Sequence, residues 1–176
     1  CAESRLLNAG QSCIAAKRFI VEETVAEEFT RRLRGHFLAA KMGDPRSTGT
    51  TLGPLARADL RDQLHDQVRR SIARGARLVT GGEIPKGSGA FYPPTILTDV
   101  VPGMPAFDEE LFGPVAAIVT VKSEAQAIAL ANLSPYGLGG GVFTTDAARG
   151  ERIARSGIES GSCFVNAYVR SDVRLP

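Results

Sequence analysis

One cysteine stands in a setting that suits chemistry better than packing. Cys13 follows the polar turn Gly10-Gln11-Ser12 and precedes the apolar run at 19–21. A thiolate is the reactive form of cysteine, and nearby cations or exposed amides lower the pKa of a thiol. Lys17 and Arg18 are close enough in the sequence to be such cations. These residues leave two alternatives open, a nucleophile at the tip of a turn or a structural cysteine, and the structural one is the default.

The two histidines do not support a cysteine hydrolase. Such an enzyme needs a histidine within hydrogen-bond reach of its nucleophile. His36 and His65 both fall in amphipathic helical patterns among charged neighbours, where we expect them to be solvated. Nothing in the sequence pairs either one with Cys13. Their spacing also lacks the pattern of metal ligands, so no zinc or other metal site is expected.

An acidic run before a Gly-Pro turn offers a second kind of chemistry. Residues 108–110 are Asp-Glu-Glu, and Leu111-Phe112-Gly113-Pro114 follows. The acids could form a solvated loop, or a carboxylate and an aromatic ring could hold a ribose and the flat ring beside it. Their spacing does not decide between these alternatives. The glycine-rich segment 137–141 is not a phosphate loop, because it lacks the G-x-x-x-x-G-K-[ST] pattern and runs into a strand.

The elements that must position these residues alternate in hydrophobic period. Strands are expected at 17–21, 78–79, 91–97, 115–121, 142–144 and 162–166, and helices at 24–42, 60–74, 123–133 and 146–156. Thr24 and Glu27 form the pattern of a capping box at the start of the first helix. Gly75 suits the left-handed cap after the second helix.

The order of these elements predicts an α/β fold. The continuous apolar run at 115–121 is typical of a strand buried on both faces. The succession of strand, helix, strand, helix and strand over 115–166 predicts two βαβ units, which require a parallel sheet with helices packed on it. We therefore expect one three-layer domain with a mainly parallel sheet and helices on both faces.

Composition excludes several function classes. The 176 residues carry 21 Lys and Arg against 19 Asp and Glu, a net charge of +2, and the basic residues are spread out, which argues against nucleic-acid binding. No apolar run approaches the roughly 20 residues of a membrane span. Three widely spaced cysteines indicate free thiols in a reducing cytoplasm. The first residue is not Met, and we expect the chain to be a piece of a longer protein.

Four segments of the chain form recognisable blocks, namely Gly10-Gln11-Ser12-Cys13 with Lys17–Val21, Gly43-Asp44-Pro45 with Gly53-Pro54-Leu55, Glu109–Val115, and Ser134–Leu138 with Val142-Phe143-Thr144. In register, and together spanning nearly the whole chain, they resemble the aldehyde dehydrogenase superfamily. Any one of them would be weak alone. The resemblance implies that residues 1–176 are the cysteine-bearing catalytic domain of such an enzyme.

The resemblance also implies roles for particular residues. Cys13 matches the nucleophile that attacks the aldehyde carbon to form a thiohemiacetal; hydride then passes to NAD or NADP, and water hydrolyses the resulting thioester to a carboxylic acid. The backbone N–H of Cys13 would be one donor to the oxyanion. Glu110 matches the carboxylate that holds the nicotinamide ribose, and Phe112 matches the ring that packs beside the ribose and nicotinamide.

The substrate is inferred from the last segment. Residues 166–176 resemble the corresponding loop of bacterial succinate-semialdehyde dehydrogenases, in which a serine and nearby basic residues can receive the distal carboxylate. Ser171 matches that serine best, and Arg170 is a possible helper, because a guanidinium offers a carboxylate paired donors. The alternative is an exposed loop whose charges face water.

Parts of the family pattern are absent, which limits what this chain is expected to do alone. The general-base Glu, the oxyanion Asn, the dinucleotide-binding domain and the oligomerisation strands find no match in it. We therefore expect a domain truncated at both ends, without turnover by itself, from an enzyme that is a homodimer or homotetramer at full length. Two alternatives remain: a cofactor-independent thiol esterase or hydrolase, and an inactive packing module.

Overall fold

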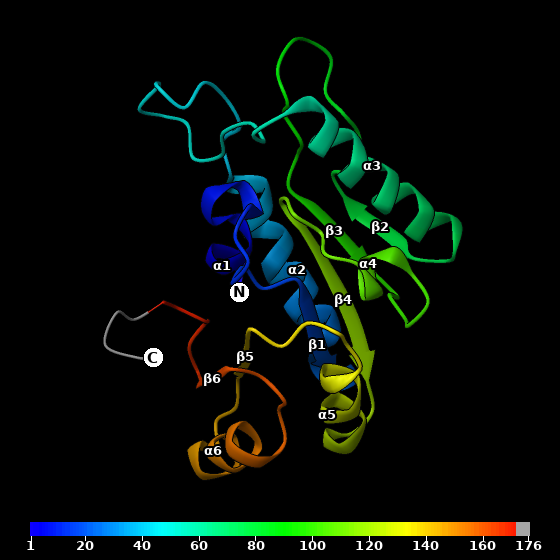
Figure 1. The fold of residues 1–176 in the computed structure, drawn as a ribbon, viewed down its shortest axis with the longest axis vertical. Coiled ribbons are helices and arrows are strands. Elements are labelled where there is room, and N and C mark those ends of the chain that lie inside the picture. Colours follow the sequence, from blue (N-terminus) through cyan, green and yellow to red (C-terminus); the bar gives the residue numbers. More distant parts are fainter. Residues whose placement is uncertain (172–176) are drawn as a thin grey trace.

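A four-stranded sheet forms the centre of the molecule in the computed structural model, which describes residues 1–171 (Figure 1). Its strand order is β1-β4-β3-β2, with β1 (Arg18–Glu22), β4 (Val115–Val121), β3 (Thr95–Thr98) and β2 (Arg77–Thr80). β4 pairs in parallel with β1 and with β3, and only β2 is antiparallel to its neighbour. The prediction of an α/β fold with a mainly parallel sheet is confirmed.

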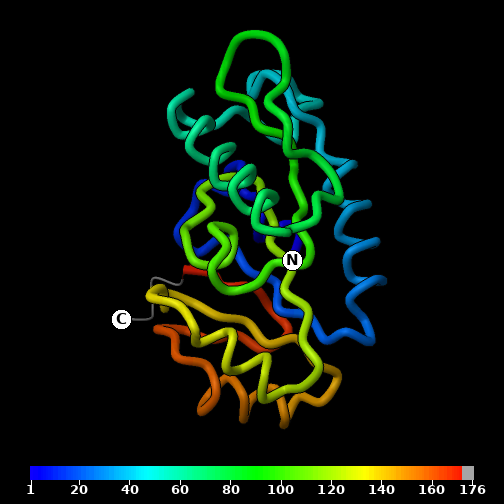
Figure 2. The backbone as a smooth tube through the Cα atoms, turned by 90° about the vertical axis from the view of Figure 1, so that its right-hand side faces the viewer, coloured from blue at the N-terminus to red at the C-terminus, as the bar shows by residue number. Residues whose placement is uncertain are grey.

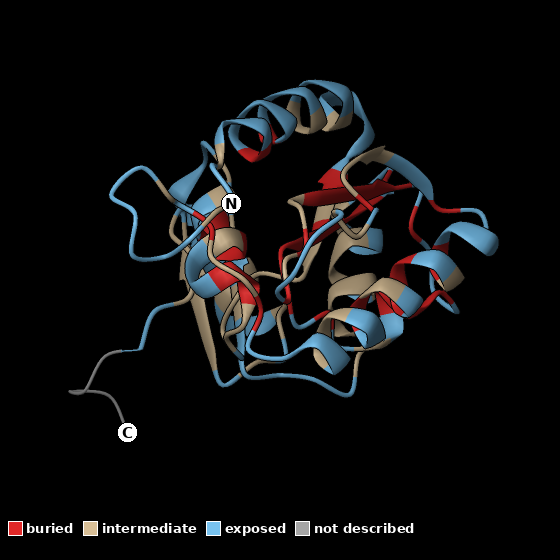
Figure 3. Cartoon of the chain, turned by 90° about the horizontal axis from the view of Figure 1, so that it is seen from above, coloured by how far each residue is buried: buried red, intermediate tan, exposed pale blue. Residues whose placement is uncertain are grey.

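Two long helices cover opposite faces of this sheet. Successive side chains of a strand point to opposite faces, so the apolar run of β4 supplies two layers of core. On one face, Ala116 and Ile118 lie in a cluster with Leu33 and Phe37 of α2 (Glu23–Ala39). On the other face, Val115, Ala117 and Val119 lie in a cluster with Leu64 and Val68 of α3 (Ala58–Ala73). Figure 2 shows α2 and α3 on either side of the strands, and Figure 3 shows that the buried residues are concentrated between them.

The chain after β4 builds a second, smaller sheet. α5 (Glu124–Asn132) packs on β1 and β4, and β5 (Gly139–Val142), α6 (Ala147–Ser156) and β6 (Ser162–Val165) then form one parallel βαβ unit. The expectation of two successive βαβ units in one sheet is therefore wrong for the first. β4 already has β1 on one edge and β3 on the other, so it has no free edge for β5.

Of the predicted helix caps, those at Ser123 and Gly75 are present and that at Thr24 is not. Ser123 Oγ accepts a hydrogen bond from the backbone N–H of Gln126 at 3.2 Å, and Gly75 follows α3 with φ of +107°. The predicted capping box is wrong, because β1 runs directly into α2 at Glu23 and places Thr24 inside the first turn.

Two strands begin elsewhere than the sequence indicated. β3 starts only at Thr95, after Pro93-Pro94, because proline has no N–H to donate to a strand pair. The strand expected at 142–144 lies at Gly139–Val142, so the glycine-rich segment is itself β5. The remaining short elements are α1 (Ala2–Leu6), the 3-10 helix η1 (Leu7–Gly10) and α4 (Pro105–Asp108). Within residues 1–171 no helix is both long and apolar enough to cross a membrane.

Candidate functional site

The parallel pairing of β1 with β4 brings two of the singled-out segments to the same end of the sheet. Arg18 at the start of β1 pairs with Ala117 near the start of β4. The segments that lead into these strands therefore reach the same edge; one carries Cys13 and the other carries Glu110 and Phe112. We call them the cysteine loop (residues 8–17) and the acidic segment (residues 107–114).

The two segments touch through a pair of glycines. A Cβ atom at Gly10 would lie 2.2 Å from the carbonyl oxygen of Gly113, and the φ of Gly10 is +76°. Both facts exclude any side chain at this position without a backbone shift. Gly10 thus allows the cysteine loop to pack directly against the Gly113 carbonyl before β4, whereas a Cβ atom at Gly113 itself would lie 2.3 Å from Leu64 Cδ2 on α3.

The backbone before Cys13 is strained. Asn8 and Ala9 have φ of 51° and 52°, so with Gly10 three successive residues are left-handed. For Ala9 this conformation costs roughly 1–2 kcal/mol, since its Cβ crowds the following carbonyl. Strained residues that persist are often found at functional sites, where the surrounding structure holds them in place.

Three side-chain contacts hold the cysteine loop. Arg5 donates from Nη2 to the carbonyl oxygen of Gly10 at 2.5 Å, Ser4 Oγ accepts from the N–H of Ala16 at 3.1 Å, and Gln11 Oε1 accepts from the N–H of Ala56 at 2.8 Å. The last contact ties the loop to the Gly-Pro-Leu segment before α3.

Arg5 is buried, and its Nε has no hydrogen-bond partner among the described residues. Burial lowers the pKa of this guanidinium to about 10, against the opposing attraction of Glu110. Arg5 therefore places a cation against the backbone of the cysteine loop, where its charge also interacts with the Glu110 carboxylate.

Cys13 itself is exposed, in the turn closed by the hydrogen bond from Ala15 N–H to Ser12 O at 3.0 Å. Within residues 1–171 its own N–H donates to no acceptor. An exposed thiol with a free adjacent amide has the arrangement expected of a nucleophile with one oxyanion donor. The other two cysteines, Cys1 and Cys163, are half-buried, and burial raises the pKa of the Cys163 thiol.

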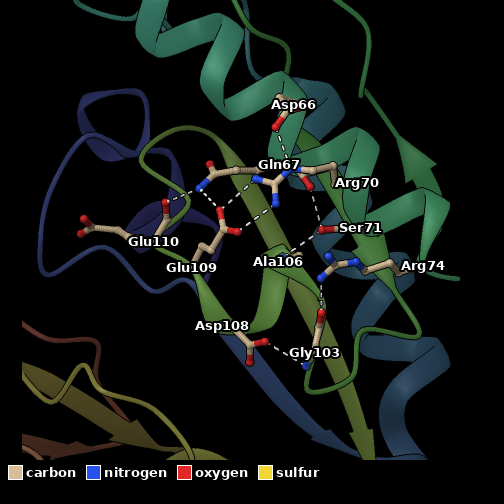
Figure 4. A network of polar contacts seen from close by, with 10 residues as sticks. All are labelled: Asp66, Gln67, Arg70, Ser71, Arg74, Gly103, Ala106, Asp108, Glu109 and Glu110. Atoms are coloured by element: carbon tan, nitrogen blue, oxygen red, sulfur yellow. Dashed lines mark hydrogen bonds and ion pairs between the residues drawn. The ribbon is translucent and has the colours of Figure 1, made fainter.

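The three acids at 108–110 have different surroundings (Figure 4). Asp108 Oδ2 accepts from the N–H of Gly103 at 2.9 Å. Glu109 accepts two hydrogen bonds from Arg70, at 3.0 and 3.1 Å, and one from Gln67 at 2.9 Å, and these donors lower the pKa of its carboxyl group. Two of the three acids are thus structural.

Glu110 is the third acid, and its side chain is free. Its carboxylate is exposed and makes no hydrogen bond or ion pair with any residue in the described part of the chain. Only its backbone is held, by a hydrogen bond from Gln67 Nε2 to its carbonyl oxygen at 3.2 Å. Figure 4 shows the side chain extending away from Arg70 and α3.

Glu110 and Phe112 line one cleft of about 420 Å³. α3, the acidic segment and the turn after α5 contribute its walls, through Leu60, Gln63, Leu64, Gln67, Glu109, Glu110, Phe112 and Tyr136. The ring of Phe112 is 39% exposed, which leaves it open to a ligand. A free carboxylate beside two aromatic rings suits a ribose with a planar ring attached, so these residues fit a nicotinamide dinucleotide.

The expected substrate residue Arg170 contacts Tyr168, which lines a hollow with neighbours of Cys13. The guanidinium of Arg170 lies 4.5 Å from the ring centroid of Tyr168, whose hydroxyl donates to Glu3 at 2.7 Å. Tyr168 lines a small hollow with Ser12 and Ile14, the two neighbours of Cys13. Arg170 is thereby brought near the cysteine loop.

Ser171 is exposed and is the last residue that the structure describes, and no contact joins it to Cys13. The remainder of the expected substrate loop, 172–176, lies outside the described residues. Both substrate assignments stay predictions. No group of three or more His, Cys, Asp or Glu side chains that could bind a metal occurs in the described part of the chain.

Several residues of the site were not identified from the sequence. Gln63 and Gln67 form an i, i+4 polar pair on α3 beside its apolar stripe, and that spacing was the available signal. Tyr136 and Lys17 stood in recognised segments, but their contacts join parts of the chain that are far apart. His65 was expected to be solvated and is half-buried, with Nδ1 3.3 Å from the Tyr92 hydroxyl, whereas His36 is exposed as predicted.

Known proteins are similar to this chain in sequence and in fold. The model of the aldehyde dehydrogenase family matches residues 1–176. An NAD(P)+ succinate semialdehyde dehydrogenase of Escherichia coli is 51% identical over 97% of this chain and 37% of its own length. A probable NADP+ succinate-semialdehyde dehydrogenase of Synechocystis is 48% identical over 98% of this chain and 38% of its own length.

Solved structures show the same similarity. The succinic semialdehyde dehydrogenase of Streptococcus pyogenes in complex with NADP+ superposes with a TM-score of 0.94, at 41% identity over 98% of this chain and 38% of that protein. An aldehyde dehydrogenase of Mycobacterium tuberculosis complexed with NAD+ superposes with a TM-score of 0.90, at 36% identity over 95% of this chain and 35% of that protein. The chain therefore spans little more than a third of the length of these relatives.

Proposed function

This chain belongs to the aldehyde dehydrogenase family, and we propose that it is the cysteine-bearing catalytic domain of a longer NAD(P)-dependent aldehyde dehydrogenase. One observation carries the proposal. The exposed thiol of Cys13 and the free carboxylate of Glu110 stand on segments that the sheet brings to one edge and that touch through Gly10 and Gly113. The pairing of β1 with β4 thus positions both the proposed nucleophile and the proposed ribose-binding cleft.

The proposed reaction begins at Cys13. Its thiolate attacks the carbonyl carbon of the aldehyde, a C–S bond forms, and the carbonyl oxygen takes up the negative charge. The free N–H of Cys13 donates to that oxygen. Glu110 would bind the ribose hydroxyls of a dinucleotide, and Phe112 would pack against the sugar and its ring. A dinucleotide held there would supply the acceptor for the hydride that leaves the former aldehyde carbon, and water would then hydrolyse the Cys13 thioester to the carboxylic acid and the free thiol.

The proposal covers either dinucleotide, because similar proteins include complexes with NAD+ and with NADP+. The complete enzyme is proposed to be a homodimer or homotetramer, which light scattering measures directly. We also propose a cytoplasmic location, because thiols are kept reduced there.

Succinate semialdehyde is the proposed substrate. The names of the E. coli and Synechocystis relatives support it, as does the cation of Arg170 held beside the cysteine loop by Tyr168. A guanidinium and a hydroxyl at 170–171 would bind the carboxylate at the far end of this substrate.

The substrate assignment is tested with Ser171→Ala in the complete enzyme. Loss of one hydrogen bond to a carboxylate is expected to raise the KM for succinate semialdehyde about tenfold and to leave the KM for butanal within about twofold. Butanal has no distal carboxylate and serves as the control. Equal increases for both aldehydes would contradict the assignment.

The function itself is tested by comparing the complete enzyme with the isolated chain. The complete enzyme should reduce NAD+ or NADP+ with succinate semialdehyde, a Cys13→Ser variant should not, and residues 1–176 alone should form no NAD(P)H. An activated ester hydrolysed at the same rate with and without dinucleotide, and no aldehyde oxidation, would favour the thiol-hydrolase alternative. NAD(P)H formation by the isolated chain would refute the proposal that residues 1–176 lack dehydrogenase turnover by themselves.

A further inference from the structure

Lys17 joins the cysteine loop to two parts of the cleft. It stands four residues after Cys13, immediately before β1. Its Nζ donates to the carbonyl oxygens of Phe107 at 3.1 Å and Glu109 at 2.5 Å, and it lies 4.9 Å from the ring centroid of Tyr136. The side chain is half-buried, so these contacts replace much of its hydration.

A cation is well suited to this position. Phe107 lies in α4 (Pro105–Asp108) and Glu109 is its C-cap, a position where a helix leaves carbonyl oxygens without intrahelical partners. An ammonium group that donates to such oxygens makes charge-assisted hydrogen bonds, which are stronger than neutral ones. The ring of Tyr136 contributes a cation–π contact to the same group.

These hydrogen bonds fix one side of Glu110. The carbonyl group of Glu109 belongs to the peptide bond that also contains the nitrogen of Glu110, so Lys17 sets the plane of that peptide. The next peptide carries the carbonyl oxygen of Glu110, which accepts from Gln67 at 3.2 Å. The backbone of Glu110 is thus held on both sides, while its carboxylate stays free for a ligand (Figure 4).

The charged groups around Lys17 make its hydrogen bonds to the carbonyls of Phe107 and Glu109 sensitive to pH. Burial, with repulsion from Arg18 and Arg5, lowers the pKa of Lys17 to about 8, although Glu110 and Asp108 attract its charge. The ammonium form is therefore present below about pH 8, and the neutral amine above it donates more weakly.

We propose that Lys17 is a positioning residue for the dinucleotide: through its hydrogen bond to the Glu109 carbonyl, it fixes the orientation in which Glu110 meets the ribose, and it contacts the Tyr136 ring in the wall of the same cleft. This inference rests on the proposed function, since it requires the cleft to bind a dinucleotide. It assigns to Lys17 no contact with substrate or reacting atoms.

Arg18 provides a matched control. It is adjacent in sequence and also donates to carbonyl oxygens, those of Leu130, Ala131 and Leu133 at the end of α5, at 3.0 to 3.2 Å. It also lies over the ring of Phe107. α5 does not line the cleft. Replacing Arg18 thus removes a comparable structural contact without freeing the peptide of Glu110.

The test measures the Kd of NAD+ and NADP+ for the complete enzyme by calorimetry, together with the unfolding midpoint. Lys17→Met is expected to weaken dinucleotide binding about tenfold, because Glu110 loses one of its two backbone anchors. Lys17→Arg, which can still donate to both carbonyls, should stay within about threefold of wild type. Arg18→Met should lower the midpoint but leave both Kd values within about twofold.

The pH dependence adds a readout that a merely structural lysine would not change. Wild-type Kd is expected to rise as pH passes about 8, whereas Kd for Lys17→Arg should stay flat across this range, because a guanidinium remains charged. Unchanged dinucleotide binding by Lys17→Met, or an equal weakening of dinucleotide binding by Arg18→Met, would overturn this inference but not the proposed function. A wild-type enzyme that binds neither dinucleotide would refute the proposed function and this inference with it.

Discussion

The cysteine loop and the acidic segment lie side by side, but they are held in different ways. In the cysteine loop, three left-handed residues and the close contact of Gly10 with Gly113 fix the backbone shape, and hydrogen bonds of Arg5, Ser4 and Gln11 hold it in place. In the acidic segment, charged and amide side chains hold the chain, with Arg70 and Gln67 on Glu109 and Lys17 on the carbonyl of Glu109.

The difference matters for how each part responds to change. A backbone contact has no adjustable partner, so altering it displaces the thiol itself. A network of side chains can lose one member and relax, and its charges titrate with pH. We therefore expect the position of Cys13 to be sensitive to added side-chain volume, and the position of Glu110 to be sensitive to changes of charge.

The largest effect is expected where the two segments touch. Gly10→Ala places a Cβ 2.2 Å from the Gly113 carbonyl oxygen at a φ of +76°, so the backbone must move. Displacing a nucleophile by about 1 Å can cost about 100-fold in rate, and we expect kcat of the complete enzyme to fall by at least that factor.

Gly35→Ala is the control for this substitution. Gly35 lies within α2, and its added Cβ would meet no atom within 4 Å. Alanine there is expected to raise the free energy of unfolding by about 0.5–1 kcal/mol and to leave kcat unchanged. A Gly10→Ala enzyme with wild-type kcat would break the comparison, since the loop would then tolerate a change of shape.

A smaller effect is expected for the reactivity of the thiols. Substoichiometric iodoacetamide near neutral pH, read by peptide mass spectrometry, should label the exposed Cys13 about tenfold faster than the half-buried Cys1 and Cys163. Burial raises the pKa of Cys163 and so reduces its thiolate fraction. Equal rates at all three cysteines would show that the loop alone does not present a reactive nucleophile.

The smallest effect is expected when a charge is removed from the acidic segment. Glu109→Gln removes the ion pair with Arg70, which is half-exposed and screened by solvent, so we expect only a small loss in the free energy of unfolding at neutral pH. Dinucleotide Kd should rise about threefold as the acidic segment loosens. Urea unfolding and calorimetry measure the two quantities.

The stability difference should also depend on pH in a definite direction. Arg70 and Gln67 lower the pKa of Glu109 in the folded protein below the ordinary value of 4.5. The stabilisation is therefore fully present above pH 4.5 and is lost as pH falls through the lower folded pKa. A difference between wild type and Glu109→Gln that stays constant from pH 7 to pH 3 would show that the carboxylate charge does not hold this segment.

Local patterns predicted much of the fold because they act within a few residues. The apolar run of β4, the cap at Ser123 and the glycine after α3 each depend on near neighbours, and all three were correct. The capping box at Thr24 failed because β1 continues directly into α2. The prediction that β5 would join the sheet of β4 was wrong, because that position depends on which strand edges are already occupied.

The sequence by itself determined the α/β class, the four family segments and the candidates Cys13, Glu110 and Phe112. Only the tertiary structure decided that Glu110 is the free acid of its run and that Lys17 holds the peptide before it. The reason is distance along the chain: Lys17 is 90 and 92 residues from the carbonyls to which it donates. No local period records such a contact, because it forms only when β1 and β4 pair and bring their preceding segments to one edge.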